Sequence, residues 1–274
     1  MTILRDLYRP VKPFRTRVGR SGGKTKQGQV SDPTLFPTGL SGRSEEARRA
    51  MESRRIETLF LADWADAVFL HFEVDREALQ EEVPFPLDRF EGKCFVSLVA
   101  FTMRGMRFAK GGKCTRWMTA PLATHRFLNL RTYVRTGGEE GIFFMKEWLD
   151  NPLSIPLGPK TFGLPYRRGE LRYAHGPEGV EGAVDCYEGS LRYRGKPGKV
   201  EAAAPVGTLS AFLLERYTAF IAAGRKPKKF RVWHEPWRHG RLPIWRSMKP
   251  LSLTGFIRPG RKRPTSSPAI SAPA

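Results

Sequence analysis

The sequence predicts an α+β fold dominated by antiparallel strands, with few helices. Short segments rich in β-branched and aromatic residues recur through the middle of the chain, separated by Gly, Pro and Asp. Only one long segment, 208–223, has the apolar spacing of an amphipathic helix. Together these two observations favour a sheet-based domain with a few packing helices.

Strands are expected over 67–74 and 94–103, followed by a hairpin of 128–135 and 141–147. Further strands are expected over 169–175, 180–194 and 199–204, as a meander, and over 228–237. Short helices are expected over 44–58 with Ser44 as the N-cap, after Asp75, and over 208–223 with Thr208 as the N-cap.

Charge divides the chain into a balanced centre and basic ends. The net charge is +20, but residues 1–55 hold 13 Lys and Arg against 5 Asp and Glu, and residues 225–274 hold 13 against 1. The centre is therefore neutral, which argues against a basic nucleic-acid groove on the fold itself. We expect disordered basic tails over 1–44 and 258–274, around one domain over 45–257.

Several classes of protein are disfavoured by composition. Three cysteines are too few for a disulfide framework and fit a cytoplasmic protein. No apolar run is long enough to span a membrane, and no secretory h-region begins the chain. His234 and His239 are five residues apart across a proline, unlike a helical zinc pair. We expect no metal and no cofactor. Oligomeric state stays open, a homo-oligomer included.

The strand over 128–135 carries the main site hypothesis. Asn129, Arg131 and Tyr133 recur at every second residue, so they share one face of the sheet. Such a face can line a wet cavity, where Arg131 would bind a carboxylate or phosphate. The alternatives are a structural ion pair of Arg131 with Glu215 or Glu147, and bonds from Asn129 and Tyr133 to loop backbone.

Five motifs in sequence carry a family resemblance. They are Asn-x-Arg-Thr-Tyr-Val (129–134), Gly-x-Phe-Phe (141–144), Leu-Pro-Tyr (164–166), Leu-x-Glu-Arg-Tyr (213–217) and His-x-Pro-Trp (234–237). From about Trp64 to Trp237 the chain resembles the YqjF-like family of uncharacterised bacterial proteins, in the acetoacetate decarboxylase-like superfamily. This resemblance implies a curved, barrel-like antiparallel sheet around a cavity. It implies no particular activity.

The same resemblance makes Schiff-base chemistry improbable at this site. The superfamily's decarboxylases use a lysine in a Pro-Lys-Lys motif, and the matching segment here is Pro165-Tyr166-Arg167. Tyrosine forms no imine and arginine stays protonated. Arg126-Phe127 also stands where relatives often have Phe-Pro-Glu. Tyr166 and Arg167 could instead bind an acid group at the cavity mouth, or pack and be solvated as an ordinary turn.

Two further residues are candidates for ligand binding. Glu215 lies just off the apolar stripe of the expected helix, so it could reach a strand arginine or face water. His234, before Pro-Trp, could act as a general base near the cavity or be a satisfied structural histidine.

The predicted function is binding of a small organic acid or carbonyl compound in the sheet cavity. If the protein is an enzyme, a lyase-type or proton-transfer reaction without a Schiff-base lysine is expected. The rival hypothesis is a non-enzymatic protein whose basic tails associate with nucleic acid or anionic membrane.

Overall fold

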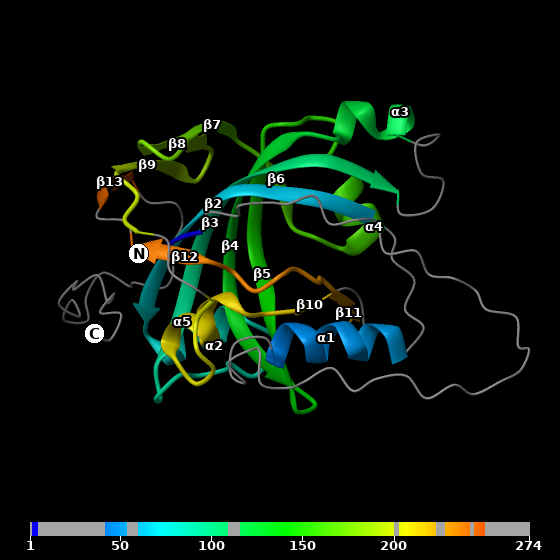
Figure 1. Ribbon diagram of the computed structural model, residues 1–274, viewed down its shortest axis with the longest axis vertical. Helices are drawn as coiled ribbons and strands as arrows, with labels where there is room; N and C mark the ends of the chain where they lie inside the picture. Colours follow the sequence, from blue (N-terminus) through cyan, green and yellow to red (C-terminus); the bar gives the residue numbers. More distant parts are fainter. Residues whose placement is uncertain are drawn as a thin grey trace, which may run out of the picture.

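The computed structural model describes residues 2–4, 42–53, 60–108, 116–199, 203–222, 228–241 and 244–249. Two sheets and five short α-helices make up these parts (Figure 1). The large sheet has the order β11-β10-β5-β4-β3-β2-β1-β12, with β6 pairing β5. The small sheet has the order β13-β9-β8-β7.

Four long strands form the centre of the large sheet, each antiparallel to the next. They are β2 (Phe60–Val74), β3 (Cys94–Phe108), β4 (His125–Thr136) and β5 (Glu139–Leu149). The expected hairpin of β4 and β5 is confirmed, and its turn uses Gly137 and Gly138 at positive φ. The strands expected over 67–74 and 94–103 are both longer than the sequence indicated.

A bulge interrupts the β4–β5 pairing beside Arg131. Arg131 pairs with Phe144, whereas Leu130 pairs with Lys146, so Met145 is the extra residue. Beyond this bulge, each side chain of β5 points to the face opposite to the one it would occupy in an unbroken register. Bulges of this kind are common near functional sites. In consequence Glu147, and not Lys146, stands opposite Asn129.

The edges of the large sheet are short strands. They are β1 (Thr2–Leu4), β6 (Tyr166–Arg168), β10 (Thr218–Ile221), β11 (Lys228–Arg231) and β12 (His239–Arg241). The pairings of β6 and β10 with β5 are parallel, so the sheet is mixed. β1 lies within the segment expected to be a tail, and it pairs with β2 and β12.

The large sheet curls, and residues 232–238 connect β11 and β12 at opposite ends of its strand order. Trp237 in this segment contacts the rings of Trp64 and Phe69 on β2. We call the face that it covers the inner face. Phe212 of α5 (Leu209–Leu214) also packs there, against Phe95.

The opposite, outer face is covered by the small sheet and by α2 (Arg76–Glu82). Leu79 of α2 and Val184 and Leu191 of the small sheet are fully buried in one core with Leu98 and Leu128. The strands of the small sheet are β7 (Glu170–His175), β8 (Val180–Cys186), β9 (Gly189–Gly195) and β13 (Ile244–Lys249).

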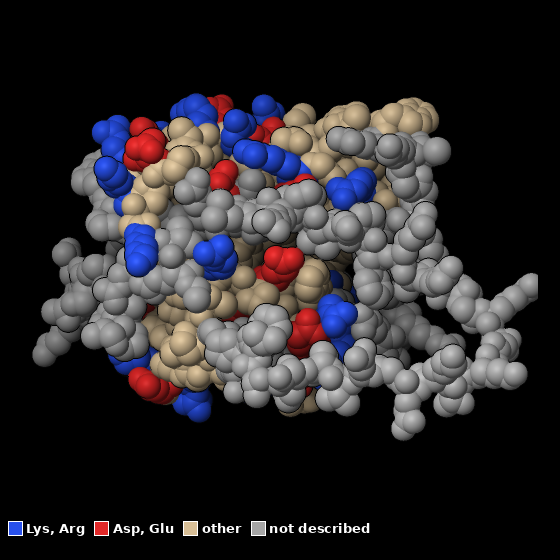
Figure 2. All heavy atoms as spheres, viewed as in Figure 1, with Lys and Arg blue, Asp and Glu red and all other residues tan. Residues whose placement is uncertain are grey.

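The expected meander is confirmed for β7, β8 and β9, but not for 199–204. Within the described part of that segment, Ala203 makes only an isolated bridge to Arg238. The place beside β9 is occupied by β13, which arrives from far along the chain. Figure 2 shows basic and acidic side chains intermixed over the small sheet, where Arg172 and Arg192 pair with Asp185.

The helix expected over 208–223 is wrong beyond Leu214. Thr208 does cap α5, accepting a hydrogen bond from the Ala211 amide. The chain then leaves helical geometry at Glu215, and Thr218–Ile221 forms β10 between β5 and β11. Thr, Phe and Ile suit a buried strand, and tertiary pairing overrides the apolar spacing.

The remaining helices are short. They are α1 (Gly42–Ser53), α3 (Arg116–Thr119) with the 3₁₀ turn η3 (Ala120–Leu122), and α4 (Leu157–Phe162). Asp75 caps α2 as expected. The strand expected over 228–237 ends at Arg231. Residues 5–41 and 250–274, with most of the expected basic tails, lie outside the described residues.

Candidate functional site

A row of polar side chains crosses the inner face at one level. His71 on β2 pairs with Ser97 on β3, and Ser97 pairs with Arg131 on β4. Residues opposite one another in a sheet point to the same side, so these three polar groups share the inner face. All three are buried. The alternation of β4 places Asn129 and Tyr133 on the same face, as predicted.

Arg131 is a buried cation with no carboxylate partner among the described residues. Its Nη2 donates to the carbonyl of Leu213 at 3.1 Å, and its guanidinium lies 5.0 Å from the centre of the Phe69 ring. Its Nε has no hydrogen-bond partner in the described chain. Neither Glu215 nor Glu147 forms an ion pair with it there, so the structural alternative weighed from the sequence is not what holds Arg131. Burial lowers the pKa of Arg131, yet a guanidinium remains protonated.

A chain of hydrogen bonds runs beside Arg131. His71 Nδ1 lies 2.7 Å from Ser97 Oγ, and Ser97 Oγ lies 2.6 Å from the Tyr133 hydroxyl. Tyr133 donates to the same Leu213 carbonyl that Arg131 contacts, at 3.0 Å. His71 Nε2, at the far end, has no partner among the described residues. Burial, and then the charge of Arg131, hold the pKa of His71 well below its usual value.

Asn129, Glu147 and Tyr166 form a second row, one step along the strands. Glu147 pairs with Asn129 on one side and with Tyr166 on the other. The Glu147 Oε2 and Asn129 Oδ1 atoms are buried without a partner in the described residues. Burial raises the pKa of Glu147 to about 8. At neutral pH this carboxyl group is therefore mostly protonated, and it can donate a hydrogen bond or a proton.

Two other predicted site residues, Glu215 and His234, lie in or next to the segments that cover the inner face, which are α5 and residues 232–238. Glu215 is buried and accepts hydrogen bonds from the Tyr217 hydroxyl and from the Trp237 amide. Burial raises the pKa of Glu215. The His234 ring stacks on Tyr217 with centres 4.5 Å apart, and its Nδ1 lies 2.8 Å from the Glu235 carbonyl. Burial lowers the pKa of His234 to about 4.

Tyr166 and Arg167 separate onto the two faces of the sheet. The Tyr166 ring meets Phe127 edge-on at 5.9 Å on the inner face. Burial, and the nearby Glu147, raise the pKa of Tyr166 well above its usual value. Arg167 is exposed and donates to Glu188 at 3.0 Å, beside Lys146. We therefore place Tyr166 near the buried polar groups and leave Arg167 out of the proposed site.

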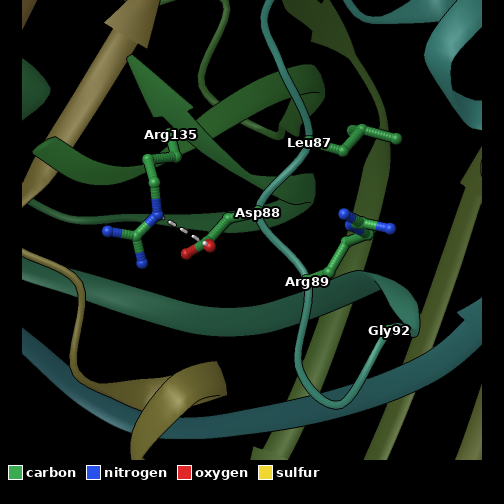
Figure 3. A pocket seen from close by; sticks show the side chains of 5 residues that line it. All are labelled: Leu87, Asp88, Arg89, Gly92 and Arg135. Carbon is green, nitrogen blue, oxygen red and sulfur yellow. Dashed lines mark hydrogen bonds and ion pairs between the residues drawn. The ribbon is translucent and has the colours of Figure 1, made fainter. Parts of the chain in front are cut away.

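A hollow of about 440 Å³ lies elsewhere, beside the loop before β3. It is lined by Leu87, Asp88, Arg89, Gly92 and Arg135. Figure 3 shows Arg89 and Arg135 on opposite sides of this loop, with Arg135 bonded to Asp88. Arg135 also pairs with Glu140, so its charge is already balanced.

Comparison with known proteins shows the family of this chain. Residues 61–266 match the profile of DUF2071, described as an uncharacterized conserved protein. The chain belongs to the DUF2071 family. It is 27% identical over 182 residues to the uncharacterized protein YqjF of Bacillus subtilis (strain 168), across 64% of this chain and 72% of that protein. The predicted YqjF-like membership is thus confirmed.

Solved structures show the fold of this DUF2071 chain. An acetoacetate decarboxylase-like enzyme from Sphingomonas wittichii RW1 matches with a TM-score of 0.50 and 16% identity, across 74% of this chain and 86% of the enzyme. Acetoacetate decarboxylase from Legionella pneumophila has a TM-score of 0.49 and 14% identity, across 73% and 80% of the two chains. The first of these matches confirms the predicted acetoacetate decarboxylase-like fold, and at 16% identity the likeness concerns fold alone.

In this DUF2071 chain, no lysine is among the buried polar residues of the described ranges. Those ranges also contain no group of three or more His, Cys, Asp or Glu placed to hold a metal ion. None of their helices is both long and apolar enough to cross a bilayer.

Sequence reasoning missed His71, Ser97 and Glu147. The first two sit in the apolar runs 67–74 and 94–103, where a polar residue on the side of Phe69 and Val99 was the available signal. Glu147 had no such signal. An unbroken hairpin register would set Lys146 opposite Asn129, and only the bulge at Met145 puts Glu147 there.

Proposed function

We propose that this protein binds a small organic acid on the inner face of the large sheet, with Arg131 as the anion contact. The observation that carries the proposal is the burial of the Arg131 guanidinium without a carboxylate partner among the described residues. A buried charge is costly unless it is paired. A ligand carboxylate would supply the missing partner, in the bidentate geometry that guanidinium groups favour.

Arg216 gives an internal comparison. It is also buried and also lies over aromatic rings, those of Phe212 and Tyr133. Its Nη1, however, is paired with Asp88 at 2.7 Å and with Glu140 at 3.1 Å. Among the described residues, the fold therefore pairs Arg216 with carboxylates, whereas Arg131 contacts only uncharged groups, the Leu213 carbonyl and Tyr133. That difference supports a ligand role for Arg131 and a structural role for Arg216.

The neighbouring groups favour a singly charged, partly polar acid. Glu147 is mostly protonated at neutral pH, so it adds little negative charge to the inner face. Asn129 and Tyr166 are uncharged, and Phe69 and Phe127 supply apolar walls. The reaction class that these groups support is proton transfer or a lyase-type step, with Glu147 as the proton donor. A covalent lysine intermediate is not part of the proposal.

Titration calorimetry with acetate, propionate and pyruvate tests the binding proposal. We expect saturable binding to the wild-type protein and its loss in Arg131→Met. Arg126→Met is the matched control, because Arg126 is on the same strand but is half exposed and paired with Asp150. The proposal fails if wild type binds none of these acids, or if Arg131→Met binds them as well as Arg126→Met does.

The two free cysteines in the described residues, Cys94 and Cys186, fit the proposed cytoplasmic location. Association of the basic termini with nucleic acid or anionic membrane is the second proposal, and the 13 basic residues against 1 acidic residue in 225–274 support it. Of the basic run 226–231, Lys229 and Arg231 pair with Glu139 on the sheet.

A further inference from the structure

The direction of each hydrogen bond beside Arg131 can be deduced from proton counting. A tyrosine has one hydroxyl proton, and Tyr133 donates it to the Leu213 carbonyl. Ser97 must then donate its own proton to the Tyr133 oxygen. His71 Nδ1 can therefore only be the donor to Ser97. In the neutral ring this places the proton on Nδ1 and leaves a lone pair on Nε2.

This lone pair is buried without a donor in the described chain. His71 is 3% exposed, and Nε2 has no hydrogen-bond partner there. Protonation does not relieve the deficit, because burial and the charge of Arg131 both disfavour the imidazolium. An unsatisfied buried acceptor is uncommon in folded proteins and calls for a specific explanation.

His71 and Arg131 lie close enough to serve one small molecule. Both flank Phe69: the guanidinium carbon of Arg131 is 5.0 Å from the centre of that ring, and the His71 ring centre is 5.8 Å from it. Both residues are also connected to the Leu213 carbonyl. Arg131 donates to it directly, and His71 is linked to it through Ser97 and Tyr133. The cation and the acceptor are thus held in a fixed relation by the same covering helix.

We infer that the organic acid bound here is a hydroxy acid, whose carboxylate binds Arg131 and whose hydroxyl group donates a hydrogen bond to His71 Nε2. This inference rests on the proposed function and adds the chemical class of the ligand. Ser97 and Tyr133 are positioning residues, since they fix the imidazole tautomer. A keto oxygen and His71 Nε2 would both be hydrogen-bond acceptors and would repel each other. A methylene group would leave the Nε2 lone pair without a hydrogen bond.

The test is a series of three-carbon acids: lactate, propionate, pyruvate and alanine. All four carry one carboxylate, and they differ in the group beside it. We expect lactate to bind at least about tenfold more tightly than propionate or pyruvate, because a site built around a hydroxyl rejects analogues without one. Alanine should bind worst, since its ammonium group would lie near the Arg131 cation.

Two variants test whether His71 causes the preference for lactate over propionate. In His71→Leu, lactate and propionate should bind equally, with propionate affinity close to that of wild type. His125→Leu is the matched control: it is another buried histidine of the inner face, six residues along β4 from Arg131 and so about 20 Å away. It should keep the lactate preference. The wild-type series is decisive even if His71→Leu fails to fold.

The outcomes separate the two proposals. If wild type binds all these acids without preferring lactate, the hydroxy-acid inference is overturned and organic-acid binding stands. If alanine binds best, the acceptor serves an ammonium donor and the inference is also overturned. If no acid binds, the proposed function itself fails. As an independent check, nitrogen NMR of labelled histidine should report the Nδ1–H tautomer for His71 and a shift of Nε2 when lactate is added.

Discussion

Arg131 and Arg216 both place a buried guanidinium group over aromatic rings. Arg216 is paired with carboxylates, whereas Arg131 contacts a backbone carbonyl. Truncating Arg216 to Met removes the buried partner of Asp88, which then keeps only the half-exposed Arg135, so we expect a loss of about 3 kcal/mol in unfolding free energy. Truncating Arg131 to Met removes a charge that has no carboxylate partner in the described residues, together with its hydrogen bonds to the Leu213 carbonyl and Tyr133. There we expect a change within about 1 kcal/mol.

Urea denaturation of the two variants at neutral pH, without added organic acid, measures this contrast. Equal losses for Arg131→Met and Arg216→Met would show that Arg131 is stabilised by the fold, and would argue against its role as a ligand contact. A small change for Arg131→Met with lost acid binding would support that role.

Glu147 should make stability depend on pH. Its pKa is about 8 in the folded protein against 4.5 as the ordinary value, so the folded state holds a proton that the unfolded state has released. The resulting stabilisation is complete below about pH 4.5 and is lost as pH rises through 8. The slope reaches about 1.4 kcal/mol per pH unit between those values.

Glu147→Gln tests this dependence because glutamine keeps the size and the hydrogen-bonding capacity without the ionisation. Unfolding free energies from pH 5 to 9 should fall for wild type and show a flatter profile for the variant. Glu188→Gln is a suitable comparison, since Glu188 is paired with Arg167 and its pKa is lowered. An unchanged slope in Glu147→Gln would mean that this carboxyl is ionised at neutral pH.

At the scale of residues, local sequence predicted one strand of the site, and the family resemblance added Tyr166. The period of two placed Asn129, Arg131 and Tyr133 on one face, and this was correct. The pairing of Arg131 with Ser97 and of Asn129 with Glu147 is a matter of register between strands. The bulge at Met145, which sets that register, has no local signature in the segment 139–149.

At the scale of elements, the packing of the small sheet requires a glycine at position 182. A Cβ at Gly182 would lie 2.0 Å from the Tyr193 ring, across the β8–β9 pair. Tyr193 cannot move away cheaply, because it is 1% exposed and its hydroxyl lies 2.7 Å from His175 Nε2. His175 in turn contacts the Asp66 carbonyl on β2, which joins the two sheets.

Gly182→Ala should therefore cost about 1–3 kcal/mol through overpacking. Gly179→Ala is the control, since a Cβ there meets only the Gly195 carbonyl, at 3.8 Å. Thermal unfolding of both variants gives the comparison. If Gly182→Ala is as stable as Gly179→Ala, the Tyr193 ring is less fixed than its contacts indicate.

Elements were predictable where local chemistry decided them. Asp75 and Thr208 cap their helices through side-chain oxygens, and both caps were expected. Ser44, also expected as an N-cap, instead lies inside α1, which begins at Gly42. The segment 215–223 was mistaken for helix because its apolar spacing suits either structure. Pairing of Thr218–Ile221 with strands far away in sequence decided the outcome.

At the scale of the whole molecule, the order of the strands in the large sheet could not be predicted from local sequence patterns. β10 and β11 join one edge of the large sheet, and β1 and β12 the other, although β11 and β12 are neighbours in the chain. Residues 232–238 join the two edges across the inner face, and this closure buries Arg131. The family resemblance supplied the curled sheet, which composition alone could not.

At the scale of the whole molecule, the excess positive charge lies in the terminal segments and not in the central domain. On the small sheet, basic side chains are intermixed with acidic ones (Figure 2). The run 258–263 has four basic residues and no acidic one. If the full chain binds polyanions, that run should provide the contacts, and each phosphate contact adds about 0.9 to the salt slope.

Fluorescence anisotropy with a labelled DNA duplex between 50 and 200 mM salt measures the slope. Replacing the four basic residues of 258–263 by Gln should reduce it by as much as about three to four. The control changes the same charge on the folded surface, at Arg89, Arg104, Arg172 and Arg194. It should have little effect, because neighbouring carboxylates repel phosphate. A larger effect of the control would place a polyanion surface on the fold itself, and it would reverse the assignment of the excess charge to the termini.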